Sequence, residues 1–225
     1  MSDFVISLGG SIIIPDKIDI KFLKAFRKVI LKHLKKGHRF FIICGGGSIA
    51  RLYQSSVKDI IKLTKDDLDW LGIHCTRLNA HLLRTIFRDY AHHRVVKNPN
   101  EKVKVSEKLI IASGYKPGCS TDFDAVLMAK NHKIDTIINL SNISYVYDKD
   151  PKRFKSAKRL KNLSWSMFRG IVGNKWIPGL NAPFDPVAAK FAEKAGLQVF
   201  IAKGTDLTNL DRILNSKSFR GSIIC

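Results

Sequence analysis

The 225-residue chain has few of the features that mark secreted, membrane and metal-binding proteins. Its four cysteines include no C-x-x-C pair, so we expect reduced, mostly structural thiols. No apolar run approaches the ~20 residues that a membrane helix needs, and no secretory leader is expected at the N-terminus. The adjacent residues His92 and His93 are poorly placed to share a metal ion. We therefore expect a cytoplasmic, globular protein with no metal site built from its own side chains.

Acidic residues are scarce as well. The chain has 19 Asp and Glu against 39 Lys and Arg, which gives a net charge of +20. Such a chain concentrates anions around itself, and weak, non-specific nucleic-acid binding is expected from charge alone. One basic cluster follows the solvated side of a predicted helix at residues 20–36. A second, at residues 152–161, contains no acid and is either a solvated loop or a flap that faces an anion.

Short aliphatic runs bounded by glycine predict six strands, at residues 4–8, 40–44, 109–112, 136–140, 199–202 and 222–224. Continuous apolar runs of this kind suit strands that are buried on both faces of a largely parallel sheet. Helical patterns lie between them, at residues 20–36, from about 66 to 86 and from 186 to 196. The alternation predicts an α/β fold, a three-layer αβα sandwich with a mainly parallel central sheet. We expect a single domain over residues 1–225, with an N-terminal lobe to about 130 and a C-terminal lobe after it.

Turns rich in glycine and hydroxyl groups follow three of the predicted strands. They are Gly9-Gly10-Ser11, Gly45-Gly46-Gly47-Ser48 and the stretch at residues 114–122. The carboxyl ends of parallel strands meet at one edge of the sheet, where open α/β folds bind ligands. Helix starts with free N–H groups suit phosphate. The sequence therefore predicts one site for a polyanionic ligand.

Glycine turns of this kind occur in two enzyme classes: enzymes that transfer a hydride with a bound dinucleotide, and enzymes that transfer a phosphoryl group. Gly45, Gly47 and Ala50 satisfy the dinucleotide spacing G-x-G-x-x-G/A, but a lone match is weak, and an earlier strand carries its own glycine pair. No G-x-x-x-x-G-K-[ST] occurs, which excludes an ordinary P-loop kinase. Phosphoryl transfer needs positioned oxygens and neutralised charge, which glycine backbones and scattered cations supply.

Three charged residues have both a structural and a functional interpretation. Arg51 is either a surface arginine or a fork for a phosphate. Asp69 is either a favourable charge near a helix start or an acceptor for a ribose hydroxyl. Asp122 either caps the helix that follows its turn or lies close to a magnesium–phosphate cluster.

Seven segments, in order along the whole chain, carry a resemblance to a known family. They are Gly9-Gly10-Ser11, residues 45–51, 69–73, 76–80, 117–122, 146–151 and 184–190. The chain resembles the amino acid kinase superfamily and, within it, the uridylate (UMP) kinases of the compact archaeal type. This resemblance implies transfer of the γ-phosphoryl group of ATP to UMP, giving UDP and ADP with Mg²⁺, as part of pyrimidine nucleotide biosynthesis. It also implies a homo-oligomer, usually a hexamer.

The resemblance assigns three groups of residues. The catalytic group is Gly9, Gly10, Ser11, Arg51 and Asp122. The UMP-binding group is Gly46, Asp69, Gly114, Tyr115, Lys116, Pro117, Gly118, Cys119, Ser120 and Thr121. The ATP-binding group is Ser7, Leu8, Gly9, Gly10, Gly47, Arg51, Ser141, Asn142, Tyr147 and Asp150. No residue is assigned as a direct metal ligand.

The chain also departs from the family pattern. Ser7 stands where many members carry a lysine, so Arg51 and Lys175 become the candidate cations. Ser144-Tyr145 replaces the usual Asp-Gly, and because glycine allows angles that tyrosine resists, the ATP-side turn must differ. Residues 176–179 differ from the lysine-bearing loop of several relatives.

Two alternative functions stay open. One is another kinase of the superfamily, such as an isopentenyl phosphate kinase. The polar residues Thr76, Arg77 and Asn79 argue mildly against an apolar tunnel beside the long helix. The other is a catalytically weakened kinase fold that acts as a nucleic-acid-binding or regulatory protein, which the excess of basic residues and Ser7 would favour.

Overall fold

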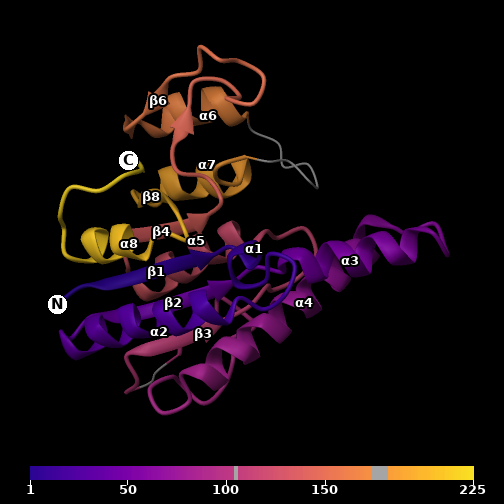
Figure 1. Cartoon of the computed structure of the whole chain (residues 1–225), viewed down its shortest axis with the longest axis horizontal. Helices are drawn as coiled ribbons and strands as arrows, with labels where there is room; N and C mark the ends of the chain where they lie inside the picture. Colours follow the sequence, from indigo (N-terminus) through magenta and orange to yellow (C-terminus); the bar gives the residue numbers. More distant parts are fainter. Residues whose placement is uncertain (104–105, 174–181) are drawn as a thin grey trace.

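A seven-stranded, mostly parallel sheet forms the centre of the computed structural model, which describes residues 1–103, 106–173 and 182–225. The strand order is β3-β2-β1-β4-β8-β9-β7 (Figure 1). Strand β9 pairs with β8 in the antiparallel direction and with β7 in the parallel direction, and the other neighbouring strands described are parallel. The strands of this sheet are β1 (Asp3–Leu8), β2 (Arg39–Cys44), β3 (Leu109–Ala112), β4 (Thr136–Ser141), β7 (Asn162–Leu163), β8 (Gln198–Lys203) and β9 (Ser222–Ile224). Two short strands, β5 (Val146–Tyr147) and β6 (Arg159–Leu160), pair separately.

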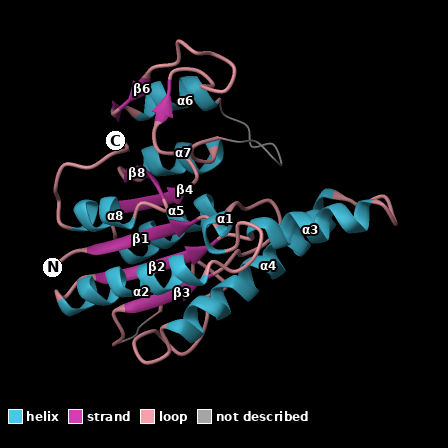
Figure 2. Cartoon of the chain, in the orientation of Figure 1, coloured by secondary structure: helices cyan, strands magenta, loops and turns pink. Residues whose placement is uncertain are grey.

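Helices cover both faces of the sheet (Figure 2). They are α1 (Gly10–Ile13), α2 (Ile20–Lys35), α3 (Gly47–Lys58), α4 (Lys65–Ile86), α5 (Thr121–His132), α6 (Trp165–Val172), α7 (Pro186–Lys194) and α8 (Leu207–Leu214). Side chains of α1, α2, α4 and α8 share one apolar core, while those of α5, α6 and α7 share the other. Helix α3 extends beyond the edge of the sheet in the same view.

The pleat of the strands separates the two cores. Phe4, Ile6 and Leu8 of β1 point into the α2 side, and Val5 points into the α5 side. Successive side chains of a strand alternate between faces, so a strand covered on both faces must be apolar throughout. This is why continuous aliphatic runs identify these strands in the sequence.

The predicted fold class and all six predicted strands are confirmed, as are the helices over residues 20–36, 66–86 and 186–196 to within a few residues at their ends. The segment at residues 144–151 forms half of a small antiparallel ladder, in which Val146 pairs with Leu160. Helices α1, α6 and α8 were not predicted. They have four to eight residues, too few for a clear helical period.

The chain order places a topological switch point between β1 and β4. From β1 the chain builds outward through β2 to β3, and it then returns to β4 on the other side of β1. The turns after β1, β2, β3 and β4 therefore meet at one edge of the sheet. This is the position at which open α/β sheets bind ligands.

Two further predictions concern cysteines and membranes. All four cysteines are free, as expected. Among the described residues, no helix is both long and apolar enough to cross a membrane.

Candidate active site

The two glycine turns at the switch point are in direct contact. A Cβ atom added to Gly10 would overlap the backbone nitrogen of Gly47 and would lie 2.5 Å from the carbonyl oxygen of Gly45. Gly47 has a φ of +71°, which L-residues with a side chain rarely adopt. The Gly45 N–H donates to the Leu8 carbonyl oxygen at 2.9 Å, and the Gly9 N–H donates to that of Leu140 at 2.8 Å. Only glycine at positions 10 and 47 permits this approach, so the backbones of the two turns lie in direct contact.

Helix α4 anchors the third turn beside these two. The Thr76 hydroxyl oxygen accepts a hydrogen bond from the Gly114 N–H at 2.8 Å, and the Asp69 carboxylate accepts one from the Gly118 N–H at 2.8 Å. Asn79 donates to the carbonyl oxygens of Gly45 at 2.7 Å and Gly46 at 3.1 Å. Polar side chains on one helix therefore fix the relative positions of the second and third turns.

Asp122 lies at the centre of a hydrogen-bond network between β1, β4 and α5. Its Oδ1 accepts hydrogen bonds from the Ser7 hydroxyl and the Asn139 amide, both at 2.9 Å, and its Oδ2 accepts one from the Asp185 N–H at 3.2 Å. Ser7 and Asn139 are register partners on adjacent strands, which explains why both reach the same oxygen. Burial raises the pKa of the Asp122 carboxyl to about 6; the Ser7 hydrogen bond opposes the rise and the nearby Asp185 carboxylate adds to it.

Asp122 does not cap α5, so the capping interpretation is wrong. Ser120 is the N-cap, and its hydroxyl oxygen accepts a hydrogen bond from the Phe123 N–H at 3.1 Å. Asp122 is the second residue of α5, and its side chain reaches Ser7 on β1 and Asn139 on β4. Its carboxylate therefore accepts hydrogen bonds from groups at the switch point and not from the first N–H groups of α5.

Asp124 is a buried carboxyl group that the sequence did not single out. It is 1% exposed, its Oδ2 accepts from the Tyr115 N–H at 3.1 Å, and its Oδ1 has no hydrogen-bond partner among the described residues. Burial raises the pKa of Asp124 to about 7; the Tyr115 hydrogen bond lowers it somewhat and the charge of Asp122 raises it further. Asp124 thus fixes the start of the third turn through its hydrogen bond with the Tyr115 N–H.

The residues expected on the ATP side surround the end of β4 and the β5–β6 ladder. Asn142 donates to the Ser11 hydroxyl oxygen at 3.1 Å, and the Ser141 hydroxyl oxygen accepts from the Ile143 N–H at 3.2 Å. Tyr147 lines a cavity of about 530 Å³ together with Tyr145, Arg159 and Arg220. Asp150 is part of a turn in which its carboxylate accepts from the Lys152 N–H at 2.9 Å.

Several of the predicted site residues have side chains that are exposed to solvent or packed in the core. Arg51 is exposed on the second turn of α3, and Lys116 is exposed on the third turn. The Leu8 side chain lies in the core, so only its backbone reaches the site. Lys175 and residues 176–179 lie outside the described residues.

The remaining expected residues occupy the third turn as the sequence indicates. Tyr115, Pro117, Cys119 and Thr121 are half-buried there. Gly118 has a φ of +77°, and a Cβ atom added there would have no neighbour within 4 Å. The three turns and Asp122 are thus brought together.

The residues that the sequence did not assign to the site are Asp124, Asn139 and Asp185, together with the anchoring roles of Thr76 and Asn79. Asn139 carried a usable signal, since it is a polar residue inside the apolar run at residues 136–140. Asp185 directly precedes the predicted helix at residues 186–196 and caps it. Its carboxylate accepts hydrogen bonds from the Val187 and Ala188 N–H groups, while its own N–H donates to Asp122.

Known proteins of similar sequence and structure share this architecture. A model of the amino acid kinase family matches residues 4–203. A uridylate kinase of Methanocorpusculum labreanum is 33% identical over 227 residues, covering 100% of this chain and 96% of that protein, and one of Methanobrevibacter smithii is 32% identical over 223 residues, covering 98% of each. The crystal structure of uridylate kinase from Archaeoglobus fulgidus covers 100% of both chains with 30% identity and a TM-score of 0.86. The predicted resemblance is confirmed, and the chain belongs to the amino acid kinase family.

Proposed function

We propose that this chain is a uridylate kinase that transfers the γ-phosphoryl group of ATP to UMP, releasing UDP and ADP within pyrimidine nucleotide biosynthesis. The observation that carries the proposal is the contact between the Gly10 and Gly45–Gly47 turns beside the third turn, which α4 anchors through Asp69 and Thr76. In-line phosphoryl transfer requires two phosphates held end to end by preorganised donors. The similarity to archaeal uridylate kinases over the full chain supports this acceptor.

The acceptor nucleotide would lie over the N-terminal lobe. Asp69 would accept a hydrogen bond from a ribose hydroxyl, and the turn from Gly114 to Thr121 would hold the base and phosphate. Thr76 and Asn79 are buried and hydrogen-bonded to the turns, so the wall beside α4 is polar at this point. A polar wall suits a nucleotide better than the prenyl chain of isopentenyl phosphate.

The donor nucleotide would lie over the C-terminal lobe. Tyr147 offers a ring for packing beside adenosine, and the adjoining cavity of about 530 Å³ is large enough for a nucleoside. Ser141 and Asn142 would bind near the phosphates, at the end of β4. Gly9, Gly10 and Ser11 would hold the transferring phosphoryl group, and Gly47 and Arg51 would lie where the two sets of phosphates meet.

Charge neutralisation must compensate for the missing lysine at position 7. Ser7 donates to Asp122 instead of offering a cation, so Arg51 is the described side chain that we assign to the phosphates. Asp122 would lie close to a magnesium–phosphate cluster, where phosphate oxygens are the hard ligands that Mg²⁺ prefers. Mg²⁺ bound to ATP would supply the remaining positive charge.

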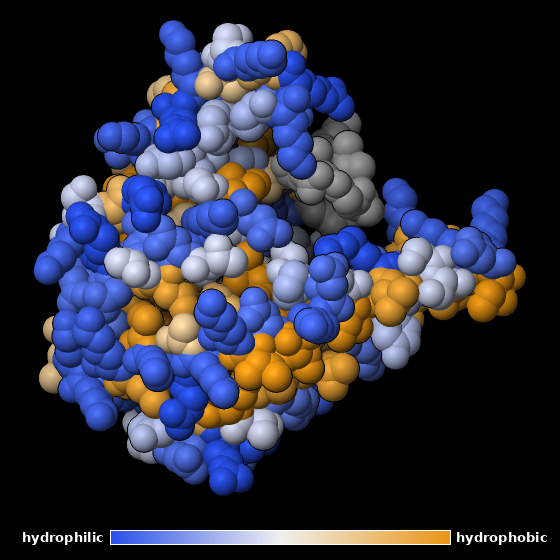
Figure 3. Space-filling model, viewed as in Figure 1, coloured by the Kyte–Doolittle hydropathy of each residue, from blue (hydrophilic) through white to orange (hydrophobic). Residues whose placement is uncertain are grey.

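We further propose that the enzyme is a homo-oligomer that associates through α3 and α4. These helices and the loop between them expose large apolar side chains, and Figure 3 shows this apolar surface along α3. The residues are Leu52, Tyr53, Ile60, Ile61, Trp70 and Leu78. Large apolar side chains exposed together on two packed helices indicate an interaction site. A hexamer and a cytoplasmic location stay predictions.

The decisive test is ADP release by the purified chain with ATP, Mg²⁺ and one acceptor at a time. We expect turnover with UMP that exceeds turnover with CMP and with isopentenyl phosphate. A preference for isopentenyl phosphate would show that the proposed acceptor is wrong, while the assignment as a phosphotransferase would stand. No turnover with any acceptor, together with salt-sensitive binding of DNA or RNA, would contradict the proposal and favour a binding protein.

A further inference from the structure

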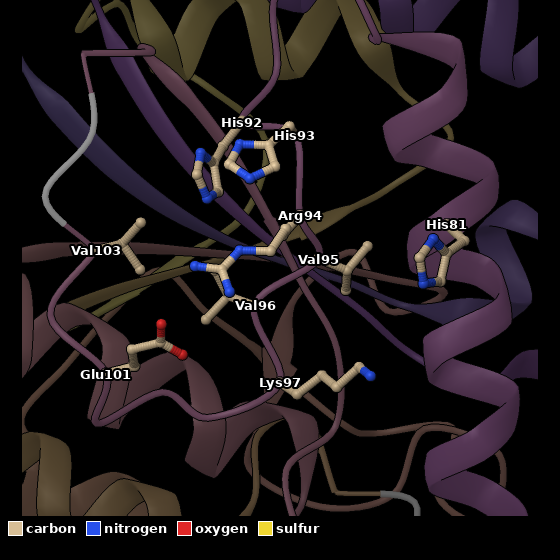
Figure 4. A pocket seen from close by; sticks show the side chains of 9 residues that line it. All are labelled: His81, His92, His93, Arg94, Val95, Val96, Lys97, Glu101 and Val103. Atoms are coloured by element: carbon tan, nitrogen blue, oxygen red, sulfur yellow. The ribbon is translucent and has the colours of Figure 1, made fainter.

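A cluster of two imidazoles and one carboxylate lies outside the nucleotide site, where the chain approaches the outer edge of β3. His92, His93 and Glu107 each offer one ligand atom, and these atoms lie within 4.8 Å of one another. The three side chains take no part in the phosphoryl-transfer site described above. Figure 4 shows the two histidine rings side by side at the top of an adjoining cavity of about 320 Å³.

Backbone pairing brings these residues together although 14 positions separate His93 from Glu107. Ala91 and Val96 form parallel bridges with Leu109 and Ala112, so the segment from 91 to 96 runs along β3. The His92 N–H donates to the Leu109 carbonyl oxygen at 2.8 Å. Glu107 lies two residues before Leu109 and therefore on the same stretch of the edge. Adjacent histidines alone make a poor metal site, and the third ligand comes only from the fold.

The His92 side chain is buried, and one of its ring nitrogens makes no hydrogen bond within the part of the chain that the structure describes. It is 7% exposed, and its Nδ1 has no hydrogen-bond partner among the described residues. The nearest carboxylate atom, Oε1 of Glu107, is 3.6 Å away, which is within ion-pair distance but too long for a hydrogen bond. A buried polar atom without a partner is costly and calls for an explanation.

The spacing of these atoms suits a metal ion better than a hydrogen bond. Two ligands on a tetrahedral Zn²⁺ with bonds of about 2.0–2.1 Å lie about 3.3 Å apart. The His92–Glu107 separation of 3.6 Å is close to this value. The rings of His92 and His93 have centroids 4.4 Å apart at 66°, and His93 is exposed, so its ring is free to rotate toward a shared ion.

We propose that His92, His93 and Glu107 bind a divalent transition-metal cation of the zinc, cobalt or nickel type, with water completing the coordination. Imidazole nitrogen suits these ions, whereas Mg²⁺ prefers oxygen ligands only. Exposed His93 and half-buried Glu107 leave an open path from solvent. The ion would fasten the segment from 91 to 96 to the start of β3, whose other end leads into the Gly114 turn.

The charges around the cluster limit the affinity without preventing binding. Arg94 and Lys97 line the same cavity and add positive charge, while Glu101 offsets part of it. His81 also lines this cavity, from α4, and in Figure 4 its ring stands apart from the two adjacent histidines. His81 is therefore a matched control, since it offers the same chemistry in the same cavity without belonging to the cluster.

The test is a titration of the untagged, metal-stripped full chain with Co²⁺, followed by visible absorption and calorimetry. We expect one equivalent to bind with a ligand-field band, and Zn²⁺ but not millimolar Mg²⁺ to displace it. His93→Ala and Glu107→Gln alter accessible side chains and should each weaken binding at least about ten-fold. His81→Ala should bind as the unaltered chain does.

Two results would overturn the proposal. One is the absence of stoichiometric Co²⁺ binding by the folded protein. The other is binding that His93→Ala and Glu107→Gln leave unchanged, which would place the ion elsewhere, for example at Cys225. Circular dichroism of each variant confirms that a loss of binding does not reflect unfolding.

Discussion

At the residue scale, the candidate site combines exposed cations with carboxylates whose environments differ. Asp69 is half-buried and accepts a backbone N–H of the third turn, whereas Asp122 and Asp124 are held inside with raised pKa values. Arg51 has no ion-pair partner among the described residues and is free to meet an anion. These differences lead to separate expectations for binding, turnover and stability.

Arg51→Ala should lower kcat by about 100-fold, because one preorganised charge at the transferring phosphates would be lost. Steady-state rates of ADP release measure this. Lys58→Ala removes a cation from the other end of α3 and should leave the rate unchanged. A near-normal rate for Arg51→Ala would make Arg51 an ordinary surface residue.

Asp69→Asn should raise KM for UMP by about 10-fold or more, as expected when a charged hydrogen bond is lost, and should leave KM for ATP close to its usual value. Initial rates at varied UMP and at varied ATP separate the two constants. The control Asp66→Asn alters an exposed carboxylate one turn earlier on α4. Equal increases in both constants would refute the assignment of Asp69 to the acceptor.

Asp124→Asn should reduce the dependence of stability on pH. Burial raises the pKa of Asp124 from 3.8 to about 7, so the folded chain holds a proton that the unfolded chain releases. The free energy of unfolding therefore falls as pH rises from about 4 to 7, by up to about 4 kcal/mol from this group. An asparagine keeps the acceptor for the Tyr115 N–H and does not titrate.

Urea unfolding at pH 5 and pH 8 tests this expectation. The loss of stability between the two values should be smaller for Asp124→Asn than for the unaltered chain. An equal loss in both proteins would mean that Asp124 titrates in its ordinary range.

At the element scale, the turns depend on glycines that serve close packing, and one pair of variants isolates this effect. Gly10→Ala would drive a Cβ into the backbone of Gly45 and Gly47, so the turns must separate and activity should fall by at least about 100-fold. Gly170→Ala adds the same methyl group on α6, where nothing lies within 4 Å, and activity should be kept. Rates of both variants, with melting temperatures, distinguish a local effect from unfolding. Full activity of Gly10→Ala would show that the turns need not touch.

Elements with a strong local pattern were predictable from the sequence, and those defined by distant contacts were not. The aliphatic runs of β1, β2 and β4 and the long helix α4 follow from the period of their apolar residues. The pairing of β5 with β6 joins residues more than ten positions apart, with only two residues on each side. The network around Asp122 likewise depends on β1 and β4 lying side by side, which no local pattern states.

At the scale of the whole molecule, the switch point explains why one edge of the sheet holds the site. Most of the residues that the resemblance assigns lie at this edge, because their order along the chain follows the order of the turns. Asp124 and Asn139 were not predicted as site residues. One is a buried carboxyl group on a helix and the other an amide in an apolar strand, and only tertiary packing brings them to the site.

The central claim is that the two nucleotides bind at once, with their phosphates meeting between the Gly10 and Gly47 turns. Inhibition by adenosine and uridine joined through a chain of five phosphates tests it most directly, because the compound spans both sites. We expect competition against ATP and against UMP, with one molecule bound per chain and weaker binding in Asp69→Asn. Competition against only one of the two substrates would contradict the account.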